Sequence, residues 1–319
     1  MVPHYKDMKI FAANSSKKLA EAIALQLGLK LGNSSVTRFS DGEINISINE
    51  TVRGSDVFII QSTSAPVNEH IMELLLIIDA FKRASAGRIT AVMPYFSYAR
   101  QDRKAKARDP ISAKLVADII TKAGADRILT MDLHAPQIQG FFDIPVDHLI
   151  GANLLAPYYI VRFADIHDDI IIVSPDLGSV ARARVFAQKI GVNLAMIDKK
   201  RSKTDESEVC NIIGDVKNKT CILFDDVVDT AGSLCNAAEA LVNIGGANEV
   251  YACATHAVLS GNACGKLQNS VIKDIVFLDT IEIPEEKMIE KLTVLTTAHV
   301  FAETITRIYE NLPVSTMFI

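Results

Sequence analysis

The chain has 319 residues, of which 49% are hydrophobic and 22% are charged, and its formal net charge at pH 7 is −5. This composition excludes a disordered chain and provides for a sizeable core, and the length fits two domains. The acidic balance argues against a dedicated nucleic-acid-binding protein, although local basic patches can still bind phosphates.

The cysteines and the N-terminal segment bear on the compartment. The five cysteines are odd in number and have no Cys-x-x-Cys spacing, which is typical of small buried residues in a reducing compartment. The first 16 residues contain no signal-peptide core, and no apolar run approaches the length of a membrane span. We therefore expect a soluble, cytoplasmic protein with no membrane or nucleic-acid partner.

Predicted strands and helices alternate along the chain. In the first half, the expected strands are residues 8–13, 36–39, 44–48, 56–61, 88–94 and 127–133, and the expected helices are 17–27, 68–84 and 112–123. In the second half, strands are expected at 170–173, 193–197, from 221 onward, 249–256 and 275–278, and helices at 154–162, 180–190, 234–244 and 297–311. This alternation is typical of parallel sheets covered by helices on both faces.

One order of elements occurs twice. Residues 57–95 and residues 221–256 both read as strand, polar loop, helix, glycine turn and strand, although chance similarity between two such units is the alternative. We predict an α/β fold of two related domains, each a mostly parallel sheet flanked by helices. The predicted domains are residues 1–150 and 151–319, and the last helix is the part of the second that could pack back on the first.

Residues 221–233 are the most informative stretch. An apolar run leads into two adjacent carboxylates, Asp225 and Asp226, and a small, hydroxyl-rich turn at residues 229–233 then opens a helix. Carboxylates accept hydrogen bonds from sugar hydroxyls, and backbone N–H groups at a helix N-terminus bind phosphate. Two consecutive acids at the end of a buried strand are costly unless they bind something. The stretch therefore predicts a sugar-phosphate site rather than an ordinary strand–turn–helix.

Three further segments carry charge after predicted strands. Residues 100–108 contain five Lys or Arg side chains, which indicates either a solvated loop or an anionic partner. Asp132 and His134 are two positions apart at the end of a strand, where their side chains would share a face. A lone histidine there is more often a hydrogen-bonded core residue than a ligand. Residues 198–208 form a charged loop that reads as exposed.

Specific motifs resemble a known family. Residues 225–233 resemble the phosphoribosyl-binding loop of the phosphoribosyltransferase fold, and residues 39–43, 100–104, 132–142 and 174–176 resemble segments of ribose-phosphate pyrophosphokinases. The resemblance runs essentially from end to end. It implies transfer of the β,γ-diphosphoryl group of ATP to the C1 hydroxyl of ribose 5-phosphate, giving phosphoribosyl pyrophosphate and AMP for nucleotide, NAD, His and Trp biosynthesis, with Mg²⁺ as cofactor.

The resemblance assigns roles position by position. The residues it implies for ATP are Phe39, Asp41, Gly42, Glu43, Arg100, Gln101, Asp102, Arg103 and His134. Those for ribose 5-phosphate are Arg201, Asp225, Asp226, Asp229, Thr230, Ala231, Gly232 and Ser233. Those for the metal are His134 and Asp176, with Asp132 as a further candidate, and the catalytic pair is Lys199 and Arg201 on a lid formed by residues 198–208. Because Mg²⁺ prefers oxygen ligands, His134 would act through a water or through ATP.

Four departures from the family pattern stand out. Ser179 replaces a usual glycine, Ser202 replaces a usual proline after the catalytic arginine, and Ser233 replaces threonine. Residues 106–109 read Lys-Ala-Arg-Asp where Arg-Ser-Arg-Glu is common. These departures remove no catalytic group. They leave allosteric regulation and the rate of lid closure undetermined by the resemblance.

The resemblance also implies partners and leaves two alternatives. It implies a homo-oligomer, a hexamer with ATP sites between neighbouring subunits, and phosphate and ADP as allosteric effectors. One alternative is a base phosphoribosyltransferase, which has no use for Phe39 or Arg100. The other is a non-catalytic regulatory subunit, which would lose cations or metal residues that this chain retains.

Overall fold

The computed structural model describes residues 5, 7–201 and 208–318, with residues 199–201, 208–210 and 318 described by their backbone alone. The described chain forms two compact units. The first takes the described residues within Met1–Ile150, Thr280–Glu282 and Thr296–Ile319, and the second takes those within Gly151–Asp279 and Ile283–Leu295. Helix α8 (Ala298–Tyr309), near the C-terminus, belongs to the first unit and packs on α1 (Lys17–Gln26).

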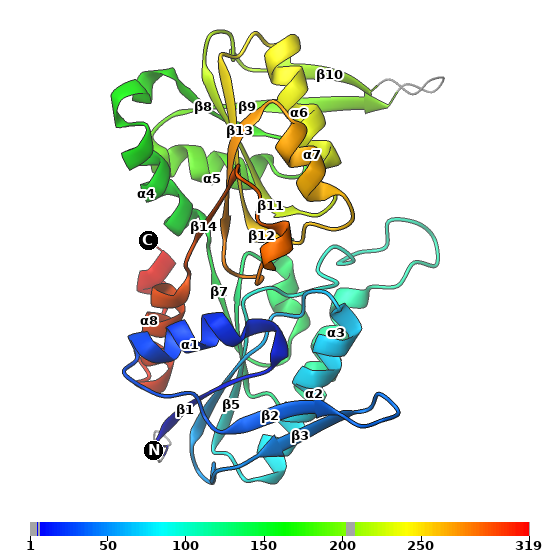
Figure 1. The fold of residues 1–319 in the computed structure, drawn as a ribbon, viewed down its shortest axis with the longest axis vertical. Helices are drawn as coiled ribbons and strands as arrows, with labels where there is room; N and C mark the ends of the chain where they lie inside the picture. The colour runs from blue at the N-terminus through cyan, green and yellow to red at the C-terminus, as the bar shows by residue number, and fades with distance from the viewer. Residues whose placement is uncertain (1–4, 6, 202–207, 319) are drawn as a thin grey trace. The chain divides into compact units, whose positions relative to one another are not determined.

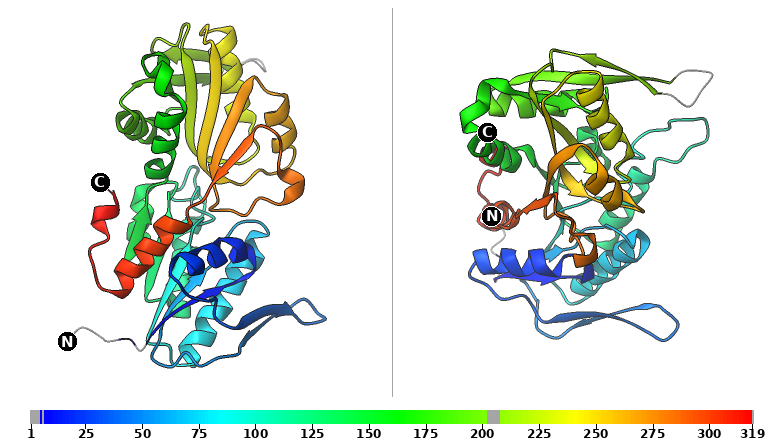
Figure 2. Two further views of the ribbon diagram at one scale, coloured as in Figure 1. Left: turned by 60° about the vertical axis from the view of Figure 1, so that its left-hand side comes forward. Right: turned by 45° about the horizontal axis from the view of Figure 1, so that its top comes forward.

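The first unit is built on a five-stranded parallel sheet of order β1-β4-β5-β6-β7 (Figure 1). The strands are β1 (Met8–Ala12), β4 (Asp56–Ile60), β5 (Arg88–Met93), β6 (Arg127–Met131) and β7 (Val146–Leu149). Helices α2 (Val67–Arg83) and α3 (Ser112–Ala123) pack together against one face, and α1 and α8 lie on the other (Figure 2). A separate antiparallel hairpin, β2 (Ser34–Arg38) and β3 (Ile44–Ile48), projects beside α2.

The second unit holds a seven-stranded sheet of order β10-β9-β8-β11-β12-β13-β14. Its strands are β8 (Ile170–Ser174), β9 (Asn193–Arg201), β10 (Glu208–Ile213), β11 (Thr220–Val228), β12 (Glu249–Ala257), β13 (Ile272–Leu278) and β14 (Leu292–Leu295). Only the β9–β10 pair is antiparallel among the described strand pairs of this sheet. Helices α4 (Ala152–Arg162) and α5 (Val180–Ile190) pack together, as do α6 (Gly232–Asn243) and α7 (Ala263–Asn269).

The two units repeat one topology, which confirms the predicted fold class. The order β1-β4-β5-β6-β7 in the first unit corresponds to β8-β11-β12-β13-β14 in the second. The repeated pattern found in the sequence is β4–α2–β5 in one unit and β11–α6–β12 in the other. In the first copy, Gln61 accepts a hydrogen bond from the Ser15 hydroxyl at 2.7 Å and donates to Glu73 at 3.0 Å. The sequence repeat aligns Gln61 and Ser62 with Asp225 and Asp226. In the first unit, therefore, the side chain at this polar position makes its hydrogen bonds inside the fold.

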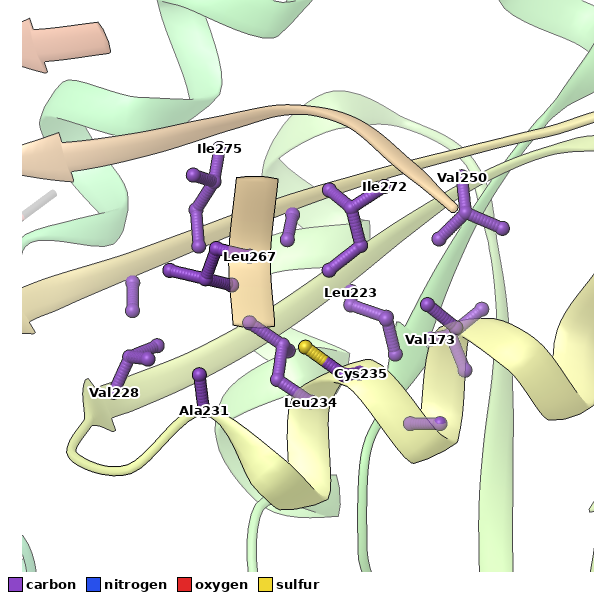
Figure 3. Close-up of a cluster of buried hydrophobic side chains, with 14 of the residues drawn as sticks. Val173, Leu223, Val228, Ala231, Leu234, Cys235, Val250, Leu267, Ile272 and Ile275 are labelled. Atoms are coloured by element: carbon purple, nitrogen blue, oxygen red, sulfur yellow. The ribbon is translucent and has the colours of Figure 1, made fainter. Parts of the chain in front are cut away.

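Buried apolar side chains fasten α6 and its preceding turn to the sheet of the second unit. Figure 3 shows Leu223 and Val228 of β11 close to Ala231, Leu234 and Cys235 at the start of α6. Each of these five residues is buried. The turn between β11 and α6 is therefore held at both ends by the core, which limits its movement.

Three predicted features were wrong. The segment expected as a charged loop at 198–208 is partly strand, because β9 continues to Arg201 and β10 begins at Glu208 as its antiparallel partner, with residues 202–207 outside the described part. Strands β7, β10 and β14 were not expected. Strand β6 ends at Met131 and Asp132 has a left-handed φ of 40°. Strand alternation therefore does not apply to Asp132 and His134.

No helix among the described residues has both the length and the apolar composition needed to cross a membrane.

Candidate functional site

In the second unit, predicted site residues lie near the carboxyl ends of neighbouring parallel strands. Asp176 lies two residues after β8, Asp225 and Asp226 lie near the end of β11, and Lys199 and Arg201 lie near the end of β9. Strand β8 pairs with both β9 and β11. Parallel α/β sheets bind ligands at this edge. The side chains of Lys199 and Arg201, and Ser202, lie outside the described residues, so their predicted roles remain predictions.

The acid pair is held by α5 and by the loop before it. Arg182 of α5 places Nη2 2.6 Å from Oδ1 of Asp226 and 3.6 Å from Oδ1 of Asp225. The Ser179 hydroxyl donates to Oδ1 of Asp225 at 2.9 Å. The Asp226 side chain is 4% exposed and the Asp225 side chain 21% exposed. The strand thus presents Asp225 to solvent and buries Asp226 against a cation.

The two carboxyls differ in what they can do chemically. Burial, followed by the charge of Asp226, raises the pKa of Asp225 from 3.8 to about 7, although Ser179 and Arg182 favour its charged form. Among the described residues, none donates a hydrogen bond to Oδ2 of Asp225. This oxygen can therefore accept a hydrogen bond from a ligand hydroxyl, whether the carboxyl is ionised or shares its proton.

The turn after β11 has the geometry of an anion cradle. Ala231 precedes α6 with a left-handed φ of 60°, and no side chain caps the helix N-terminus. The first N–H groups of a helix have no partner within the helix and face an anion favourably. Thr230 and Ser233 are exposed beside these groups, and a Cβ on Gly232 would meet nothing closer than Lys266 Nζ at 3.9 Å. The backbone at Gly232 is therefore open to the approach of a ligand atom.

In the first unit, the predicted ATP residues form two groups. One group follows β5 and β6: Asp102 accepts a hydrogen bond from Gln137 at 2.9 Å, which ties residues 100–103 to the segment after His134. The other is the exposed turn of the β2–β3 hairpin, where Gly42 has φ 96° and its N–H donates to the Phe39 carbonyl at 3.0 Å. Phe39 is 55% exposed on this turn, together with Asp41 and Glu43.

A pocket of about 420 Å³ adjoins residues 100–108, which we call the basic loop. It is lined by the first turn of α2, by Tyr95 and Tyr98, and by Arg100 and Gln101. Small-molecule pockets of about 300–1,000 Å³ accept a nucleoside-sized group. The hydroxyl of Tyr98 donates to Asn68 at 2.7 Å, which fixes one wall. The exposed Arg100 and Arg103 put positive charge at this end of the sheet.

Residues behind the 132–134 turn hold it in place. The N–H of Asp132 donates to the Leu149 carbonyl at 3.0 Å, and the N–H of Leu133 donates to Nε2 of His148 at 2.8 Å. Strand β7 therefore fixes a turn whose left-handed residue would otherwise be unfavourable. His134 and Asp132 project from this fixed turn, each partly exposed.

Sequence reasoning assigned no role to several residues that the structure places at these sites. Arg182, His148, Tyr95 and Tyr98 lie outside the segments that carry the resemblance, and Ser179 was named only as a departure from the family pattern. Arg182 had one available signal, because it lies two positions into a helix that starts just after Asp176 and faces a strand with two acids. His148 had none, because only the β6–β7 pairing brings it to residue 133.

Comparison with known proteins identifies the family. The family model for the N-terminal domain of ribose phosphate pyrophosphokinase matches residues 8–124, and the model for the phosphoribosyl synthetase-associated domain matches residues 202–319. The chain is 62% identical over 318 residues to ribose-phosphate pyrophosphokinase of Clostridium tetani, covering 100% of this chain and 99% of the relative. It is 60% identical to that of Caldanaerobacter subterraneus, covering 100% of both.

A solved structure agrees with the sequence matches. The crystal structure of phosphoribosylpyrophosphate synthetase from Mycobacterium smegmatis superposes with a TM-score of 0.91 and 44% sequence identity, covering 96% of this chain and 100% of that one. Identity of this size over essentially full length accompanies the acid pair, the phosphate turn and the basic loop described above. The chain belongs to the ribose-phosphate pyrophosphokinase family.

Proposed function

We propose that the protein transfers the β,γ-diphosphoryl group of ATP to the C1 hydroxyl of ribose 5-phosphate, forming phosphoribosyl pyrophosphate and AMP for nucleotide, NAD, His and Trp biosynthesis. The observation that carries this proposal is the acid pair of β11 followed by an open phosphate turn at the N-terminus of α6. A phosphorylated ribose matches both parts, and family membership supplies the reaction.

Ribose 5-phosphate binds to the second unit in this proposal. Oδ2 of Asp225 accepts a hydrogen bond from a ribose hydroxyl, and Asp226 supports Asp225 from the buried side. The turn of Asp229, Thr230, Ala231, Gly232 and Ser233 holds the 5-phosphate through backbone N–H groups and through the hydroxyls of Thr230 and Ser233. The core contacts of Ala231 and Leu234 keep these donors fixed, so the sugar is oriented when it binds.

ATP binds to the first unit through the basic loop. Arg100, Gln101 and Arg103 contact the nucleotide, Asp102 keeps the loop in place through Gln137, and His134 contacts the phosphates. The hairpin turn with Phe39, Asp41, Gly42 and Glu43 recognises adenine by stacking on Phe39 and by hydrogen bonds from the base to the acids. Because this turn projects from its own unit and is exposed, it suits a nucleotide bound by a neighbouring copy (Figure 2). We therefore include a homo-oligomer, a hexamer, in the proposal.

The chemical step is an in-line displacement at phosphorus. The C1 oxygen of the ribose forms a bond to the β-phosphorus, the bond from the β-phosphorus to the oxygen that bridges it to the α-phosphorus breaks, and AMP leaves with that oxygen. The C1 hydroxyl proton is released to solvent. Lys199 and Arg201 neutralise the charge that develops on the transferring group, as cations do in phosphoryl transfer generally. The carboxylates of β11 align the acceptor.

Magnesium fits the donor set of this chain. Asp176 accepts the Ser179 N–H on Oδ1 at 2.9 Å, and no described residue donates to its Oδ2. No three His, Cys, Asp or Glu side chains gather as a metal cage among the described residues. Mg²⁺ keeps several waters and is bound by one or two carboxylates together with substrate phosphates, so it needs few protein oxygens. Asp176 is the residue of the second unit that would hold Mg²⁺, and Asp132, with His134 acting through a water, is the candidate of the first unit. The bound ion would neutralise phosphate charge.

The wider setting completes the proposal. The enzyme works in the cytoplasm, where ATP is at hand, and phosphate and ADP act as allosteric effectors. The family pattern supports these statements. This chain departs from that pattern at four places, which are residues 106–109, Ser179, Ser202 and Ser233. Its regulation is therefore the property that we most expect to differ from that of its relatives.

The test is AMP release by the pure protein from ATP and ribose 5-phosphate. We expect AMP only when both substrates and Mg²⁺ are present, and a fall of at least about a hundredfold in kcat for Lys199→Ala. A base phosphoribosyltransferase would instead consume phosphoribosyl pyrophosphate and release no AMP from ATP. A regulatory subunit would turn over only with a partner chain. Lys199→Ala activity within a few-fold of wild type would show that the assigned catalytic role is wrong.

A further inference from the structure

Ser179 lies between Asp176 and the start of α5, and its side chain reaches the acid pair. The residue is 3% exposed, at the N-cap of α5, with φ −90° and ψ −4°. An N-cap serine normally accepts a hydrogen bond from the second or third helical N–H. Here no side-chain cap bond forms, and the hydroxyl donates to Oδ1 of Asp225 at 2.9 Å.

Ser179 also contacts the proposed metal residue. Its backbone N–H donates to Oδ1 of Asp176 at 2.9 Å. One residue therefore links a carboxylate after β8 to a carboxylate on β11, inside the second unit. The backbone bond would survive in glycine, whereas the hydroxyl bond exists only because this chain has serine.

The hydroxyl acts on a carboxylate whose two oxygens have different surroundings. Oδ1 of Asp225 accepts the Ser179 hydroxyl and the Asp226 N–H, both at 2.9 Å, and faces Arg182 Nη2 at 3.6 Å. Oδ2 receives no donor from any described residue. A carboxylate oxygen has about two lone-pair sites. Oδ1 is thus fully used by the protein, and the broad carboxylate torsion is fixed by these donors.

We propose that Ser179 is a positioning residue for ribose 5-phosphate, holding Oδ1 of Asp225 so that Oδ2 faces the ribose hydroxyls. This inference rests on the proposed role of Asp225. It concerns substrate affinity rather than the transfer step, because Ser179 contacts neither the diphosphoryl group nor the leaving AMP in the proposed arrangement.

The first experiment compares Ser179→Ala with wild type. Alanine fits the helical backbone angles and removes only the hydroxyl, so the melting temperature should stay close to wild type. The KM for ribose 5-phosphate should rise about tenfold, as expected for one lost hydrogen bond to a charged group, while kcat and the KM for ATP change less than about twofold. The matched control is Ser270→Ala in the same unit, whose hydroxyl donates to the Leu267 carbonyl at 2.7 Å and accepts the Ile272 N–H at 3.2 Å. It should leave all three constants unchanged.

A double-mutant cycle with Asp225→Ala tests the role of Ser179 separately from the proposed ribose site at Asp225. Affinity is measured by titration calorimetry with ribose 5-phosphate itself, so that inactive variants remain informative. If Ser179 acts through Asp225, Ser179→Ala weakens binding in the wild type and has no further effect in Asp225→Ala. Equal effects in both backgrounds, or no effect in the wild type while Asp225→Ala weakens binding, would overturn the inference. Unchanged binding in Asp225→Ala would instead overturn the proposed ribose site.

Discussion

Replacing Asp225 by asparagine separates what the acid pair does for binding from what it costs in stability. Burial and the neighbouring Asp226 raise the pKa of Asp225 from 3.8 to about 7 in the folded protein. The stabilising contribution of such a carboxyl is fully present below its unfolded pKa and is lost as the pH rises through its folded pKa. From about pH 4 to about pH 7, the wild type therefore loses free energy of unfolding relative to Asp225→Asn.

The structure sets the size of this effect. The difference between 3.8 and about 7 corresponds to about 4 kcal/mol once the carboxyl is fully ionised. The Asp225 side chain keeps 21% of its area exposed. Solvent screens part of the charge, so we expect about 2 kcal/mol in favour of Asp225→Asn at pH 8 and less than half of that at pH 5.

The assay is urea unfolding of wild type and Asp225→Asn at pH 5 and at pH 8, without substrates. The control is Asp165→Asn, an exposed carboxylate of the same unit, which should show no pH-dependent difference. Binding of ribose 5-phosphate should weaken in Asp225→Asn although the fold is more stable, which is the trade-off expected at a binding site. The reasoning is refuted if Asp225→Asn is less stable than wild type at pH 8, or if its advantage does not grow from pH 5 to pH 8.

Three further predictions test other parts of the account. Arg182→Met removes the cation 2.6 Å from Asp226 Oδ1 and should lower the free energy of unfolding by about 2–4 kcal/mol in urea, so a loss below about 0.5 kcal/mol would contradict the buried ion pair. In Gly232→Ala the new Cβ has room in the free protein but enters the phosphate turn. The KM for ribose 5-phosphate should therefore rise about tenfold with no loss of melting temperature, and an unchanged KM would argue against the turn. The third prediction mixes Phe39→Ala and Lys199→Ala subunits in equal amounts, unfolds them and reassembles them together. If the hairpin turn with Phe39 serves a neighbouring copy, about a quarter of the sites combine an intact turn with an intact lysine, so about a quarter of wild-type activity should return. Activity no higher than that of the separate variants would place the turn in its own subunit's site.

Local patterns in the sequence were enough for the repeated α/β fold and for the acid-and-turn motif. The run before Asp225 is continuously apolar because β11 is buried on both faces between β8 and β12. The residues after Asp229 form a compact turn before α6, in which a Cβ on Gly232 would meet no atom closer than 3.9 Å. Both signals are local, so they can be read without knowing which strands pair.

The features that were missed depend on pairing between distant segments. Residues 198–208 are predicted as a loop because they are charged, yet β9 continues past residue 197 through backbone pairing such as that of Asp198 with Asn211. Short β7 and β14 at the sheet edges have weak patterns of four residues each. The Ser179–Asp225 and Arg182–Asp226 contacts join residues more than 40 positions apart. No local motif predicts them.

The most direct test of the central claim follows the β-phosphorus of ATP. Pure protein is given Mg²⁺, ribose 5-phosphate and ATP labelled in the β-phosphate, and the products are separated. Transfer of a diphosphoryl group predicts that the label leaves the nucleotide and appears in phosphoribosyl pyrophosphate, in an amount equal to the AMP formed. Label that stays with the nucleotide as ADP would mean transfer of a single phosphoryl group, and would contradict the account.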